Sequence, residues 1–151
     1  MLDRDAIARL IPHQGRMCLL SSVESFTPTA IVCRAVSHAD PDNPLRRNGI
    51  LAPVCGIEYG LQAMAVHGAM LDETPQRPGY LTSLRDVRFA DGVADLASVG
   101  TPLAVRADLL HKDGAGFIYS FDISAAGSGG PGSLLSGQAM IIIPPAPEGQ
   151  K

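Results

Sequence analysis

The segment from residue 50 to residue 71 constrains the fold more than any other part of the chain. It reads ILAPVCGIEYGLQAMAVHGAML, which is long enough for a helix, and Pro53 suits a first helical turn. Glu58 is the one formally charged residue between Arg47 and Asp72. A helix that is apolar on every face is usually buried on every face. The sequence therefore predicts one central helix that the rest of the protein surrounds.

This helix is not expected to span a membrane. A glutamate, a glutamine, a histidine, three glycines and a proline interrupt the apolar residues. Each glycine lowers helix propensity by roughly 1 kcal/mol relative to alanine. Such a cost predicts that another layer approaches the helix backbone closely at Gly56, Gly60 and Gly68.

The segments on either side of the helix carry mostly strand patterns. A short amphipathic helix is expected over Asp3–Ile11, extended chain over 17–23 and a strand over Ala30–Val36, whereas residues 37–49 are dense in Pro, Asp and Asn and predict a loop. After the helix, alternation and turn residues predict four strands, at 80–89, 103–111, 117–125 and 134–143. The KDGAG between the second and third of these is typical of a hairpin.

This order of elements predicts an α+β fold. We expect one domain over residues 1–143, a glycine-rich turn at 126–132 and a flexible, proline-rich tail over residues 144–151. A domain of this size leaves one side of the helix thinly covered, which favours a dimer.

Composition narrows the class of protein further. Charged residues make up 18% of the 151 residues, against roughly 25% in an average soluble chain, which also suggests surface buried in an oligomer. The net charge of -3 and the absence of a basic block argue against a nucleic-acid partner. Three cysteines without a CxxC pair, and four histidines without ligand spacing, argue against disulfides and a metal site. The N-terminus does not resemble a secretory signal, so we expect a cytoplasmic protein.

Three features together resemble a known family. PHQGRMCLL near the start and NPLRRNGILAPVCGIEYGLQAMAVHGAM in the middle, followed by four strands, are similar to the hotdog-fold 3-hydroxyacyl-acyl carrier protein dehydratases. The likeness is greatest to the branch found in aryl polyene-type biosynthesis. It extends over about residues 5–143, and GIEYGLQAMA is its most specific part.

The resemblance implies a fold and a reaction. The fold is a long helix wrapped by a curved antiparallel sheet, in dimers whose acyl tunnels form at the interface. The reaction removes water from a 3-hydroxyacyl thioester, carried on acyl carrier protein or coenzyme A, and gives the trans-2-enoyl thioester. It needs neither a metal nor a redox cofactor. Family members use a loop histidine of one protomer and a helix carboxylate of the other, with backbone amides at the helix start holding the thioester oxygen.

Glu58 matches the family carboxylate, in GIEY. A single charge among some twenty apolar residues is costly without a role, which independently singles out this residue. Gln62 lies one turn further on the same face. We expect Gln62 to orient the carboxylate or to line the substrate pocket.

Asn43 stands where the resemblance places the catalytic histidine. An amide donates and accepts hydrogen bonds but does not transfer protons near neutral pH. His38, five residues earlier, would need a different loop path to replace it. Pro53, Val54 and Cys55 match the start of the helix, where they are expected to meet the substrate, although Pro53 has no N–H to offer the thioester oxygen.

The other three histidines are weaker candidates. His13, in the PHQGRM turn, is expected to be structural, His67 to pack on the helix or at an interface, and His111 to be solvated at a strand end. Three functions remain open. They are a 3-hydroxyacyl thioester dehydratase, a hotdog thioester hydrolase that uses Glu58 and water, and a non-catalytic acyl-binding or partner subunit of a complete homologue.

Overall fold

The computed structural model describes residues 1–127 and 132–145. Most of the turn expected at 126–132 and of the tail expected at 144–151 lies outside this part of the chain. The described part of the chain contains two helices, six strands and several short 3-10 turns. In chain order the helices and strands are α1 (Arg4–Ala8), β1 (Ser22–Thr27), β2 (Ala30–Ala35), α2 (Gly56–Asp72), β3 (Tyr80–Phe89), β4 (Leu103–Asp113), β5 (Gly116–Ala125) and β6 (Ser133–Ile142).

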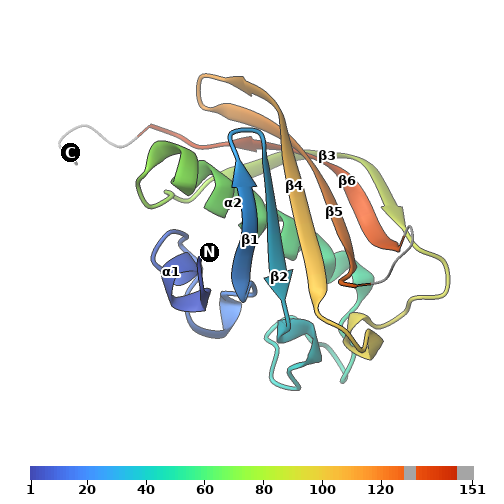
Figure 1. Ribbon diagram of the computed structural model, residues 1–151. Helices are drawn as coiled ribbons and strands as arrows, with labels where there is room; N and C mark the ends of the chain where they lie inside the picture. Colours follow the sequence, from blue (N-terminus) through green and yellow to red (C-terminus); the bar gives the residue numbers. More distant parts are fainter. Residues whose placement is uncertain (128–131, 146–151) are drawn as a thin grey trace.

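The six strands form one antiparallel sheet that curves around α2 (Figure 1). Their order across the sheet is β1-β2-β4-β5-β6-β3, so β1 and β3 are the two edges. Helix α1 lies beside β1. The predicted α+β architecture, with one long helix wrapped by an antiparallel sheet, is confirmed.

The start of α2 and the position of β1 differ from the sequence-based expectation. Helix α2 begins at Gly56 rather than at residue 50, because Pro53–Cys55 forms a separate 3-10 turn and the chain before it makes a tight turn with Gly49 at φ 76°. Strand β1 lies over Ser22–Thr27, whereas extended chain was expected over 17–23. Only Val23 of β1 is buried, so this strand has almost no alternation for a pattern to detect.

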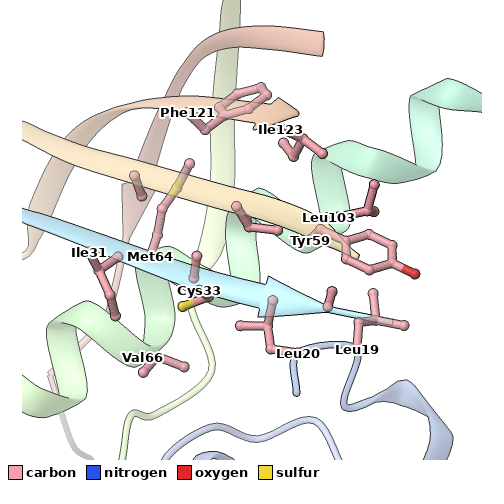
Figure 2. Packing of buried hydrophobic residues seen from close by; sticks show 14 of the residues in the cluster. Leu19, Leu20, Ile31, Cys33, Tyr59, Met64, Val66, Leu103, Phe121 and Ile123 are labelled. Carbon is pink, nitrogen blue, oxygen red and sulfur yellow. The ribbon is translucent and has the colours of Figure 1, made fainter. Parts of the chain in front are cut away.

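The core lies between α2 and the concave face of the sheet (Figure 2). Ten residues of α2 are buried, which is why nearly every face of this helix is apolar. A Cβ on Gly60 would lie 3.2 Å from the Phe121 ring, and a Cβ on Gly56 would collide with Leu135. The close approach of another layer expected at these glycines is therefore present at Gly56 and Gly60, whereas a Cβ on Gly68 would meet only the Gln76 side chain, at 2.9 Å. None of the helices in the described ranges combines the length and hydropathy needed to cross a membrane.

Candidate active site

A cavity of about 280 Å³ lies along the less buried face of α2. From the helix, Glu58, Leu61, Ala65 and Gly68 line it at spacings of three and four residues, so they form one stripe. Further apolar side chains line it from the sheet, namely Leu81, Phe117 and Ile141, and from Ile143 just beyond β6. The volume is near the lower end for ligand cavities, and the apolar walls suit an alkyl chain.

His13 and Glu58 meet in this cavity. Nε2 of His13 lies 3.8 Å from Oε1 of Glu58, and their side chains are 29% and 31% exposed. This distance is longer than a hydrogen bond, but it allows direct charge interaction. An imidazole beside a carboxylate is a combination that can move protons to and from a substrate.

The turn that carries His13 is held by side chains on both sides of it. Asp3 caps α1 by accepting a hydrogen bond from the N–H of Ala6 at 2.9 Å. Gln14 donates to the carbonyl of Ala8 at 2.7 Å, which ties the turn back to that helix. Helix α1 ends at Ala8, earlier than the expected Ile11. His13 therefore belongs to an irregular but anchored segment.

Gln62 fixes the chain that follows this turn. It is fully buried, its Oε1 accepts from the N–H of Leu19 at 2.9 Å, and its Nε2 donates to the carbonyl of Met17 at 2.6 Å. Both polar atoms are thus bound to backbone, and Gln62 is not among the residues that line the cavity. Its expected contact with substrate stays a prediction, and its observed contacts join α2 to the His13 segment.

Asn43 is buried and committed to its own loop. Its Nδ2 donates to the carbonyl of Ser37 at 2.8 Å and to the hydroxyl of Tyr59 at 3.1 Å, while its Oδ1 accepts from the N–H of Leu45 at 2.8 Å. Burial raises the pKa of Tyr59, although the hydrogen bonds from Ser37 and Asn43 counteract this rise. Asn43 does not line the cavity that contains Glu58 of the same protomer. Its catalytic role stays a prediction.

Pro53, Val54 and Cys55 form the 3-10 turn before α2 and do not line the cavity either. Val54 is 56% exposed. The Cys55 thiol donates to the carbonyl of Leu45 at 3.7 Å, and burial raises its pKa, which disfavours a reactive thiolate. Their contact with substrate, as sequence similarity implies it, also stays a prediction.

Two other histidines are used by the fold. His38 is buried and its Nε2 lies 3.1 Å and 3.0 Å from the carbonyls of Val99 and Thr101. His67 is bound at Nδ1 by the Tyr119 hydroxyl at 2.8 Å and at Nε2 by the carbonyl of Thr27 at 2.9 Å. Burial lowers the pKa of His67, so it remains neutral at pH 7.

The contact between His13 and Glu58 could not be predicted from the sequence. The motif PHQGRM was noted, but a turn histidine far from Glu58 in the chain carries no local sign of the contact. Arg77, which also lines the cavity, was missed for the same reason. Within the described ranges, no cluster of three or more His, Cys, Asp or Glu is arranged to hold a metal ion.

Three solved structures illustrate the range of proteins with the same architecture. The dehydratase heterocomplex ApeI:P from Xenorhabdus doucetiae matches with a TM-score of 0.76 and 24% identity, over 96% of this chain and 93% of that one. AziG from S. sahachiroi matches with a TM-score of 0.61 and 17% identity, over 89% and 97%. A mutant of a Staphylococcus aureus thioesterase matches with a TM-score of 0.57 and 12% identity, over 82% and 93%. These likenesses establish the hotdog fold.

Sequence comparison narrows the choice among hotdog proteins. No curated protein matches the chain. The family model described as ApeP dehydratase, ApeP-like, matches residues 5–148, which is nearly the whole chain. With the hotdog fold, the GIEY helix and Glu58 in a cavity, this match shows that the chain belongs to the ApeP-like dehydratase family.

Proposed function

We propose that this protein removes water from 3-hydroxyacyl thioesters to give trans-2-enoyl thioesters. The observation that carries the proposal is the position of Glu58, the family carboxylate, in a cavity with apolar walls. The acyl chain lies against those walls. The thioester arrives on the phosphopantetheine arm of an acyl carrier protein or of coenzyme A.

The reaction needs three groups. A base removes a proton from C2, an acid protonates the departing 3-hydroxyl, and donors stabilise the charge on the thioester oxygen. Glu58 is assigned as the acid, because its carboxyl group is the proton-carrying side chain that α2 presents to the cavity. The backbone N–H of Val54 remains available near the start of α2, whereas Pro53 has none.

We further propose that a second hotdog subunit pairs with the free edge of β3. Within the described residues β3 pairs only with β6, and its Tyr80, Leu81 and Leu84 are 67%, 43% and 39% exposed. An edge strand of this length with exposed apolar side chains is a template for pairing with another chain. Leu81 also lines the cavity, so a subunit docked there would cover one side of it. The heteromeric assembly of the structurally similar ApeI:P supports a partner that is a different hotdog chain.

Incubation with 3-hydroxyhexanoyl-pantetheine tests the reaction. Mass spectrometry is expected to detect the enoyl thioester, 18 mass units lighter through loss of one water. Glu58→Gln is expected to lower turnover by about 10²-fold or more, the usual scale for loss of a proton-transfer group. Glu73→Gln is the matched control, because Glu73 is exposed just beyond α2 and outside the cavity lining. Release of free pantetheine without enoyl product would instead identify a thioester hydrolase.

A non-catalytic partner subunit is the second candidate, and Asn43 is the observation that favours it. An amide at the position of the family histidine, with its groups bound to the loop, cannot act as a base. This candidate requires an inactive wild-type protein. It also expects Asn43→His to create dehydration, because an imidazole titrates near neutral pH.

A further inference from the structure

The four histidines of the chain differ in how far the fold uses them. His67 is hydrogen-bonded at both ring nitrogens, and His38 is bound at Nε2 by two backbone carbonyls. His111 is exposed near the end of β4. His13 is the remaining one, and it is the histidine that lines the cavity with Glu58.

The imidazole of His13 has no structural task of its own. Its Nδ1, like Nδ1 of His38, is buried and has no hydrogen-bond partner within the described residues. Unlike His38, His13 is not hydrogen-bonded at Nε2 either, which faces Oε1 of Glu58 in the cavity at 3.8 Å. A buried polar atom without a partner is costly, and such atoms concentrate where a ligand completes the site. The turn around it is nevertheless firmly anchored, through Gln14 and through the Gln62 contacts to Met17 and Leu19. The protein therefore holds an imidazole that the fold does not hydrogen-bond at a defined place in the cavity.

We propose that His13 is the general base of the dehydration and acts with Glu58 of the same protomer. This inference rests on the proposed function. It differs from the arrangement that family resemblance implies, in which a loop histidine of the other protomer supplies the base. It also explains how a chain with Asn43 at that position retains a proton-transfer pair.

The proton transfers of the reaction balance within His13 and Glu58. Nε2 of His13 takes the proton from C2, and the electrons of the C2–H bond form the C2=C3 double bond. The C3–O bond breaks, and the hydroxyl leaves as water with a proton from the Glu58 carboxyl group. The imidazolium of His13 then returns its proton to the Glu58 carboxylate, across the gap that measures 3.8 Å here. No other reactant is consumed.

Two partial reactions of the full chain, in the oligomeric form in which it is isolated, test the assignment. The first is dehydration of 3-hydroxyhexanoyl-pantetheine. The second is exchange of the C2 protons of hexanoyl-pantetheine with D2O, which requires the base but no leaving hydroxyl. His13→Ala and the bulkier His13→Gln are expected to lower both rates by about 10²-fold or more. Added imidazole is expected to restore part of both rates in His13→Ala, which a purely structural role would not allow. His111→Gln serves as the control and should behave as wild type.

The outcomes separate the two proposals. Dehydration that is lost in Glu58→Gln but unchanged in both His13 variants would overturn the role of His13 and leave the dehydratase function intact. Exchange at C2 that depends on His13, without any dehydration, would overturn the dehydratase function and the pairing with Glu58, while identifying His13 as a base that acts at C2. A wild-type protein with neither activity would overturn both.

Discussion

The side-chain carbonyl of Gln62 accepts a hydrogen bond of 2.9 Å from the backbone N–H of Leu19. The same side chain donates to the carbonyl of Met17, so one residue of α2 binds two backbone groups of the segment that follows the His13 turn. Glu58 lies one turn earlier on the same helix. Gln62 thereby fixes the position of that segment along α2 relative to the Glu58 carboxylate.

Gln62→Leu is expected to lower the free energy of unfolding by about 2 kcal/mol or more. The change leaves the N–H of Leu19 and the carbonyl of Met17 without their partner, and buried groups left unpaired cost about 1–3 kcal/mol each. Urea denaturation followed by circular dichroism measures the loss. Gln14→Leu is the control, because Gln14 is exposed and water can replace its bonds. Equal losses of unfolding free energy in the two variants would contradict the stabilising role of the Gln62 hydrogen bonds.

Asn43→Ala is expected to destabilise the protein by about 1–3 kcal/mol, whatever it does to catalysis. It removes three hydrogen bonds, to Ser37, Tyr59 and Leu45, from a side chain that is 5% exposed. Thermal unfolding by calorimetry measures this change. Asp42→Ala removes a neighbouring exposed side chain, and its ion pair with Arg16 lies on the surface, where water and salt screen it. An Asn43→Ala protein as stable as Asp42→Ala would show that the loop network is not formed.

The buried His67 is expected to make the protein less stable in weak acid. Burial lowers its pKa, while its hydrogen bond to the Thr27 carbonyl and the charge of Asp108 act in the opposite direction. As the pH falls below about 6.5, the ordinary value, the unfolded chain binds a proton that the folded protein resists. The free energy of unfolding therefore decreases until the pH passes the lower folded pKa, and is constant with respect to this group below it.

His67→Gln measures that contribution. Urea denaturation at pH 7.5 and pH 5.0 should show a smaller decrease for His67→Gln than for wild type, even if the variant is less stable at both. His111→Gln alters an exposed histidine and should retain the wild-type decrease. An identical decrease in all three proteins would rule out the neutral, buried His67.

Leu84→Lys is expected to weaken subunit association. The residue lies on the β3 edge and is 39% exposed, and charged side chains on an edge strand oppose pairing with another chain. Analytical ultracentrifugation should show a shift toward the monomer. Leu110→Lys is the control, because Leu110 is 52% exposed on β4, a strand in the middle of the sheet. A shift with Leu110→Lys alone would place the interface elsewhere.

Much of the fold could be predicted because its signals are local. Strands β3 to β6 alternate or are bounded by turn residues, and the Asp-Gly of the β4–β5 turn has Gly114 at φ 57°. The start of α2 and the position of β1 were predicted less well. A proline suits a 3-10 turn as well as a first helical turn, and β1 buries only Val23.

The sequence by itself determined the central helix, the strands around it and the candidate carboxylate. A helix apolar on all faces has to be surrounded, and Glu58 stands out as the charge within it. Only the tertiary structure decided which histidine meets Glu58 and where the amide of Asn43 points. These contacts depend on how separate segments are anchored, by Gln62 for the His13 segment and by Tyr59 for Asn43. Local periodicity carries no information on such long-range contacts, because it reports the face of an element and not its neighbour.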